Sequence, residues 1–304
     1  VFGAIAAVAV RGYGLNVLTH PWNPYFPVVL WLLVLLAAWS VVLGDHWMAL
    51  VVVTVGSIAA QTHVPYLLNA IAVCALVLGL MLWRLRSPDT RDDVRRPVLV
   101  TLLVGAGMWV LPFVDQLIHD PGNIRRLVRH FAAEPPEPAI GLVEGAKVFF
   151  RHLDAPAAVL DLFLHESSFV HRSGLPHPSP IVGAVVFVLW VAAAIAAHRR
   201  RHRALDALNA VIAVALATGA FSMIRIFGKV WYYLTLWAWA STLLVVLSIL
   251  WTGWTLLRPA AERVHDRRVI EIAATATIAI CTVMSLGAAV VLEVPEDQMS
   301  DGLR

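Results

Sequence analysis

Long apolar segments alternate with short polar stretches along most of this chain. Inside lipid a segment must satisfy its own backbone hydrogen bonds, which an α-helix does. The pattern therefore predicts an all-α, polytopic transmembrane helical bundle with about eight or nine spans. Residues 1–10 are also apolar but too few to cross a bilayer, so we expect a first span that is only partial. The segments are 26–43, 47–60, 65–83, 98–114, 181–197, 207–224, 231–257 and 269–292.

Arginine clusters follow the third, fifth and seventh of these segments, at 84–96, 199–203 and 258–268. Counting spans between the clusters places all three on one side, which the positive-inside rule assigns to the cytoplasm. We therefore expect a multi-pass plasma-membrane protein with membrane helices at 1–114 and 181–292. The long loop 115–180 and the tail 293–304 are then extracytoplasmic.

The long outer loop also carries helical patterns. In 123–131 the apolar residues fall on one helical face and the basic residues on the other, with Asn123 as the expected N-cap. This predicts a short amphipathic helix lying along the membrane surface. Two further helices are expected at 139–153 and 155–165, the second capped by Asp154.

Composition narrows the function classes. Sixty per cent of the residues are hydrophobic, and the net charge of +3 comes from clusters between apolar segments, so we expect lipid contact and no nucleic-acid partner. No soluble-enzyme motif is present. Cys74 and Cys281 lie in apolar segments and are interpreted as packing residues. His165, Glu166 and His171 fit no zinc spacing, so no metal ligands are assigned.

Four polar clusters fall on the expected outer side, each beside an apolar segment. Ionisable and polar groups at that depth usually have a functional reason, although each cluster alone could be a cap, a turn or an interfacial anchor. Together they predict a substrate-binding site at the outer membrane boundary. Its candidate residues are His20, Asn23, Gln61, His63, Tyr66, Asp115, Gln116, Arg225 and Lys229.

Arg225 and Lys229 are the candidates for phosphate binding. They are four positions apart, so a helical turn would place both on one face. Arginine can bind phosphate oxygens through two N–H groups, and lysine adds a point charge. The alternative is that both side chains extend to the lipid headgroups as anchors.

Three motifs carry a resemblance to a known family. They are HPWNPYFPVVLWLLVLLAAWSVVLGD at 20–45, QTHVPY at 61–66 and LPFVDQLIHDPGN at 111–123. This run resembles the middle of actinobacterial multi-pass proteins of the GT-C glycosyltransferase class, which are similar to protein O-mannosyltransferases and aminoarabinose transferases. The resemblance implies transfer of a sugar from a polyprenyl-phosphate carrier on the extracytoplasmic face, often with help from a divalent metal.

The resemblance also implies a catalytic carboxylate in the first outer loop of the class. This chain begins several spans later, Asp115 does not match that position, and the catalytic residue is therefore unassigned. We expect this chain alone to be inactive. The alternatives are a transporter or flippase for a lipid-linked substrate, and a non-catalytic membrane scaffold.

Overall fold

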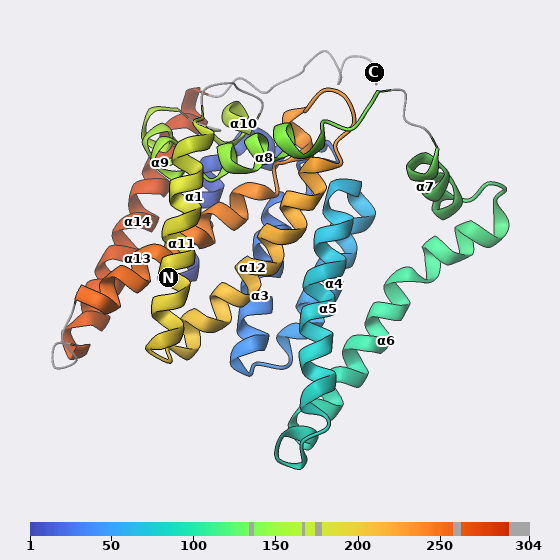
Figure 1. Cartoon of the computed structure of the whole chain (residues 1–304), viewed down its shortest axis with the longest axis horizontal. Helices are drawn as coiled ribbons and strands as arrows, with labels where there is room; N and C mark the ends of the chain where they lie inside the picture. The colour runs from blue at the N-terminus through green and yellow to red at the C-terminus, as the bar shows by residue number, and fades with distance from the viewer. Residues whose placement is uncertain (134–136, 166–167, 174–177, 258–262, 292–304) are drawn as a thin grey trace.

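In a computed structural model the described residues, which are 1–133, 137–165, 168–173, 178–257 and 263–291, form a helical bundle (Figure 1). Within these ranges there is one isolated β-bridge, between Ala139 and Phe227, and no named strand. The expected all-α polytopic bundle is confirmed.

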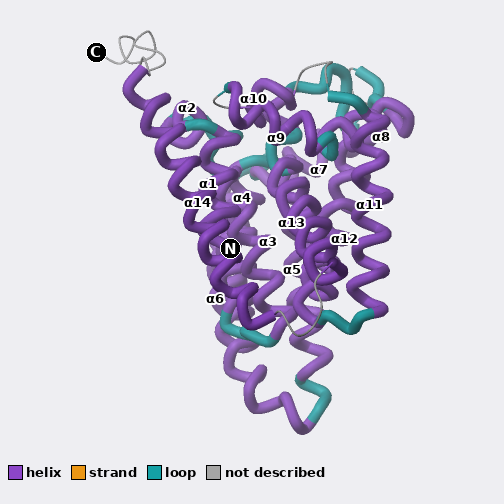
Figure 2. Tube along the Cα trace, turned by 90° about the vertical axis from the view of Figure 1, so that its left-hand side faces the viewer, coloured by secondary structure: helices purple, strands orange, loops and turns teal. Residues whose placement is uncertain are grey.

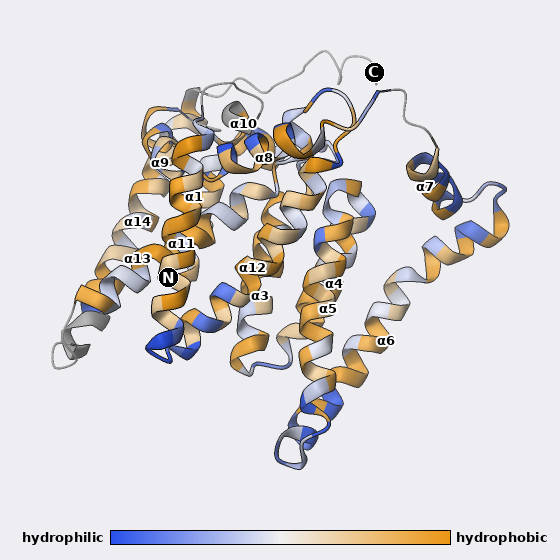
Figure 3. Cartoon of the chain, viewed as in Figure 1, coloured by the Kyte–Doolittle hydropathy of each residue, from blue (hydrophilic) through white to orange (hydrophobic). Residues whose placement is uncertain are grey.

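Six described helices are long and apolar enough to cross a membrane, which defines a multi-pass membrane protein. Three shorter apolar helices, α1 (Phe2–Tyr13), α3 (Pro27–Leu43) and α4 (Met48–Thr62), belong to the same bundle. In Figure 3 most residues along these helices are coloured orange, as hydrophobic, and blue hydrophilic residues gather near several helix ends. The six long helices are α5 (Leu67–Arg84, preceded by the 3-10 turn η1, Val64–Tyr66), α6 (Pro88–Ile118), α11 (Pro180–Arg199), α12 (Arg203–Ile224), α13 (Ala238–Leu257) and α14 (Arg263–Val291).

Several helices differ from the boundaries that hydropathy predicted; α12 and α14 begin earlier than expected, at Arg203 and Arg263, and two further differences change the adjoining loops. The segment expected at 98–114 is the middle of α6, whose helix continues through the exposed basic residues before it and past the expected loop boundary at 115. In the segment expected at 231–257 the α-helix begins only at Ala238. The residues before it include the 3-10 turn η2 (Tyr232–Leu234). Hydropathy records whether residues are apolar, and it does not record where a helix starts or stops.

Short helices lie across one end of the bundle, as Figures 1 and 2 show. These are α2 (Leu15–Thr19), α7 (Asn123–Ala132), α8 (Gly141–His152), α9 (Ala155–Leu164) and α10 (Ser168–Ser173). The helices expected in the outer loop are therefore confirmed. Asp154 does cap α9, since its carboxylate accepts from the backbone N–H of Ala157 at 3.3 Å. Its other oxygen accepts from the backbone N–H of Ser179, just before α11, at 2.8 Å.

Buried polar contacts hold the long helices in register. The side-chain oxygen of Asn209 on α12 accepts from the indole N–H of Trp190 on α11 at 2.9 Å. It also accepts from the hydroxyl of Ser248 on α13 at 2.7 Å. Hydrogen bonds between membrane helices contribute about 0.5–2 kcal/mol each. Asn209 thus fixes three neighbouring helices at one depth.

Candidate functional site

Three of the four predicted polar clusters meet at the end of the bundle that carries the short helices. Tyr25 and Tyr232 join their hydroxyls in a hydrogen bond at 2.5 Å. The rings of His63 and Tyr233 lie 6.1 Å apart. The Asn23 amide donates to the backbone carbonyl of Thr62 at 3.2 Å. Segments 20–25, 61–66 and 225–233 therefore form one layer, although they are far apart in sequence.

Several candidate residues in this layer hold the structure together. The ring of His20 lies 5.7 Å from that of Tyr25 and belongs to the aromatic layer. Gln61 donates to the carbonyl of Met108 at 3.0 Å and so links α4 to α6. Tyr66 is buried in the core beside Trp31. The structure gives these three side chains contacts within the bundle, away from the cavity described below.

Asp115 and Gln116 cap the amphipathic helix α7. The Asp115 carboxylate accepts from the backbone N–H of Asn123, and the Gln116 side-chain oxygen accepts from that of Arg125, both at 2.8 Å. The prediction that Asn123 is the N-cap is wrong, because the N-cap position is Gly122 and the capping groups come from the end of α6. Free N–H groups at a helix start need acceptors, and a neighbouring helix supplies them here.

This cap makes a testable prediction. Asp115→Ala should speed amide hydrogen exchange in the first turn of α7 by about fivefold, since losing an N-terminal cap costs about 1 kcal/mol. Asp120→Ala is the matched control. This substitution removes the ion pair between Asp120 and Arg125. The Asp120 side chain is 84% exposed, and ion pairs between exposed side chains contribute little to stability. Equal exchange rates in the two variants would show that Asp115 does not hold α7.

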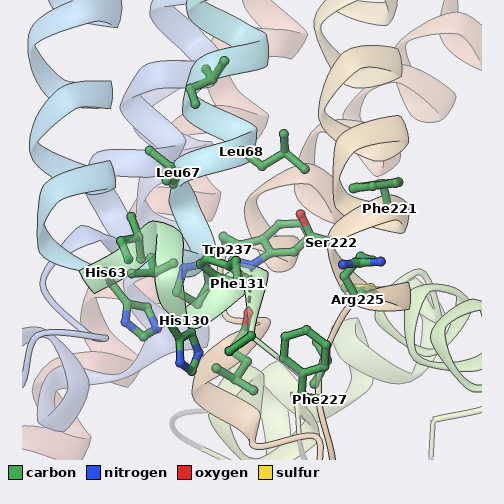
Figure 4. Close-up of a pocket in the computed structure, with 18 residues that line it drawn as sticks. His63, Leu67, Leu68, His130, Phe131, Phe221, Ser222, Arg225, Phe227 and Trp237 are labelled. Atoms are coloured by element: carbon green, nitrogen blue, oxygen red, sulfur yellow. Dashed lines mark hydrogen bonds between the residues drawn. The ribbon is translucent and has the colours of Figure 1, made fainter. Parts of the chain in front are cut away.

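A cavity of about 810 Å³ opens among α5, α7 and α12 at this end of the bundle (Figure 4). Leu67, Leu68 and Ile71 of α5 form one wall, and Phe221 of α12 faces them. Ile71 is 55% exposed and Phe221 is 56% exposed, and both belong to helices long and apolar enough to cross a membrane. The cavity is therefore an open, apolar pocket between two such helices.

Helix α7 contributes one side of the pocket. Leu127, His130 and Phe131 line the cavity, and Figure 4 shows His130 and Phe131 beside His63. The amphipathic pattern predicted the helix but assigned His130 to its basic face, whereas His130 lines the pocket together with Leu127 and Phe131. The contribution of this helix to the pocket was missed. That contribution depends on the cap at Asp115 and Gln116, which no local pattern reveals.

The polar groups of the pocket are few. Arg225 follows the last residue of α12 and is the one Arg or Lys among the described lining residues. No described residue forms a hydrogen bond or an ion pair with its guanidinium group. His63 lines the opposite side, where burial lowers the pKa of its imidazole and keeps the ring neutral at neutral pH. The fixed positive charge of this pocket therefore sits at Arg225.

Lys229 does not share a helical face with Arg225, so that prediction is wrong. The chain leaves α12 at Arg225, and Gly228 adopts a φ of +63°. The next residues pair with the loop before α8: Gly228 N–H donates to the carbonyl of Pro138 at 3.1 Å. Lys229 places its ammonium 4.2 Å from the centre of the Trp231 ring and does not line the pocket. Residues 226–228 form backbone hydrogen bonds with residues 138–140 in place of the helical hydrogen bonds that would have put Arg225 and Lys229 on one face.

The other residues considered for metal binding or disulfide formation lie outside the pocket. Within the described ranges no three His, Cys, Asp or Glu side chains gather closely enough to hold a metal ion, so the divalent metal that the resemblance implies has no ligand set there. Cys74 and Cys281 are free thiols. His165 pairs with Asp161 at 2.9 Å, whereas Glu166 lies outside the described residues.

The fold and the pocket define a multi-pass α-helical membrane protein with an apolar, singly charged cavity at one end of its bundle. No protein-family model, no curated protein and no solved structure matches this chain.

Proposed function

We propose that this chain is part of a GT-C-type membrane glycosyltransferase that binds a polyprenyl-phosphate sugar donor on the extracytoplasmic face. The observation that carries the proposal is the apolar pocket with the guanidinium of Arg225 at its edge, a group to which no described residue forms a hydrogen bond or an ion pair. A polyprenyl phosphate has the matching chemistry, which is an apolar chain that ends in an anion.

The dimensions and charge of the pocket support this ligand class. Small-molecule sites commonly measure about 300–1,000 Å³, and 810 Å³ falls in that range. Arg225 can bind two phosphate oxygens at once, in the fork geometry that guanidinium favours. During transfer the same group would stabilise the negative charge that develops on the leaving phosphate. The general base that the transfer needs is not assigned to a residue of this chain.

The position of the pocket favours an enzyme over a transporter. Transporter sites typically lie near the bilayer midplane, between broken helices. Here Arg225 follows the end of α12, and α7 covers the cavity from outside the bundle. A scaffold would have no use for a cation that no described residue pairs with, beside an apolar pocket.

Ligand preference tests the proposal directly. The protein in lipid nanodiscs should bind a polyprenyl phosphate at least roughly tenfold more tightly than the uncharged polyprenol of equal length, because a charged hydrogen bond contributes about 1.5–3 kcal/mol. Titration of both lipids against intrinsic tryptophan fluorescence would measure this. Equal affinity for the two lipids, or binding of neither, would refute the proposed function.

The proposed sidedness has its own test. With Cys74 and Cys281 replaced by alanine, Asp89→Cys should resist an impermeant maleimide in intact cells, and Arg129→Cys should react. Asp89 lies in the first turn of α6, and Arg129 is exposed on α7 beyond its other end. Permeabilised cells should label both positions. Labelling of both in intact cells would contradict the orientation.

A further inference from the structure

A second, very small cavity lies where the end of α8 meets α12 and the start of α13. It leaves about 10 Å³ open to the centre of a water molecule. His152 of α8, Gly219 of α12, and Ser241 and Thr242 of α13 are among the residues that line it. A cavity can hold one water when about 10–15 Å³ is open in this sense and roughly two to four polar groups surround it. The space therefore fits a single water, and the polar groups in its wall decide whether one binds.

His152 supplies a free hydrogen-bond acceptor to this cavity. The residue is 4% exposed, and its Nδ1 lies 2.9 Å from the backbone carbonyl of Val148. A carbonyl can only accept, so Nδ1 carries the ring proton. Burial lowers the pKa of the imidazole to about 4, which keeps the ring neutral at neutral pH and leaves a lone pair on Nε2. No described residue forms a hydrogen bond with this Nε2.

Helix α13 supplies the other polar groups. Ser241 is 2% exposed, and its hydroxyl also has no hydrogen-bond partner among the described residues. The Thr242 hydroxyl donates to the backbone carbonyl of His152 at 2.8 Å and can still accept a bond from another donor. A water in the cavity can accept from Ser241 and donate to Nε2 of His152 and to Thr242. Buried waters typically form about three such bonds.

We infer that this cavity binds one water molecule, which links His152 of α8 to Ser241 of α13. The bond from Thr242 to the carbonyl of His152 already joins the same two helices, so the water adds a second link at this junction. Met223 and Trp237 line both this cavity and the larger pocket that holds Arg225. The water therefore helps to fix the helices beside that pocket, whatever the pocket binds.

Replacing Ser241 distinguishes a bonded hydroxyl from an unsatisfied one by the sign of the change in stability. If Ser241 donates to a water, Ser241→Ala should raise the unfolding equilibrium constant in detergent by about fivefold, which corresponds to roughly 1 kcal/mol. If the hydroxyl has no partner, its removal relieves a buried unsatisfied group, and the variant should be at least as stable as the native protein.

Thr252→Val, on the same helix, is the matched control. The Thr252 hydroxyl is also buried and has no partner among the described residues, but Thr252 does not line the cavity. This variant should keep or increase the stability of the protein, because it removes an unsatisfied group. A Ser241→Ala variant that is not destabilised would overturn the water site, and so would equal destabilisation by Thr252→Val.

Solid-state NMR of the native protein in bilayers tests for the water itself and does not depend on a variant folding. With isotope-labelled histidine and tryptophan, Nε2 of His152 should receive magnetisation from water protons at neutral pH. The exposed ring of His198 is the positive control, and the buried indole of Trp190, which donates to Asn209, is the negative control. Transfer to His198 without transfer to His152 would refute the site, even if Ser241 and His152 bond to each other directly.

Discussion

Arg225→Ala should weaken binding of a polyprenyl phosphate by roughly tenfold to hundredfold, because a hydrogen-bonded charge contributes about 1.5–3 kcal/mol. Arg225 is the fixed charge among the described residues of the pocket, and no described side chain there replaces it. The loss should appear in titrations with the phosphate and be absent with the uncharged polyprenol. Arg225→Lys should recover part of the affinity, since lysine keeps the charge and loses the two-point contact.

Lys229→Ala is the matched control for Arg225→Ala. Lys229 carries the same charge and lies in the same loop after α12. Its ammonium lies over the ring of Trp231, and Lys229 does not line the pocket. We expect its removal to change the affinity by less than about twofold, since exposed charges contribute little at a distance. Both side chains are exposed, so neither change should lower the unfolding temperature. If Lys229→Ala weakens binding as much as Arg225→Ala, the phosphate does not bind specifically at Arg225.

Gly183→Ala should destabilise the protein by about 3 kcal/mol, because overpacking typically costs about 1–3 kcal/mol and here the obstacle is backbone, which cannot rotate away as a side chain can. A Cβ at Gly183 on α11 would overlap the backbone carbonyl of Phe150 on α8. On its other side α8 is held equally closely, since a Cβ at Gly145 would lie 2.7 Å from the Cα of Ile224. Helix α8 therefore cannot move away from α11 without pressing on α12, whose next residue is Arg225.

The control for Gly183→Ala is the same substitution at Gly253 on α13, where an added Cβ meets nothing within 4 Å. Alanine in an open helical position should be neutral or stabilise by about 0.5–1 kcal/mol. Thermal unfolding in detergent, followed by the fraction of protein that stays monodisperse, would compare the two variants. Equal midpoints would show that the close contact between α8 and α11 is not needed for the fold.

The helices of this protein follow from its sequence because each depends on local properties. Apolar runs long enough to cross a bilayer predicted α5, α11 and α12, and the amphipathic period at 123–131 predicted α7. The capping role of Asp154 also followed from its place before Pro156. Where the prediction failed at 231–237, an apolar turn has the same hydropathy as an apolar helix, so no local quantity could separate them.

The binding pocket was decided by tertiary structure. Asp115 and Gln116 were predicted as ligand contacts. They cap α7 because the chain turns back after α6 and brings the start of α7 beside these two side chains. Lys229 was predicted beside Arg225, and the pairing of Gly228 with Pro138 turned it away. These contacts join residues from different elements, and a sequence pattern carries no information on which distant backbone groups meet. The sequence alone determined the helices and the polar character of their ends, whereas packing between distant segments determined which of those polar groups face one cavity.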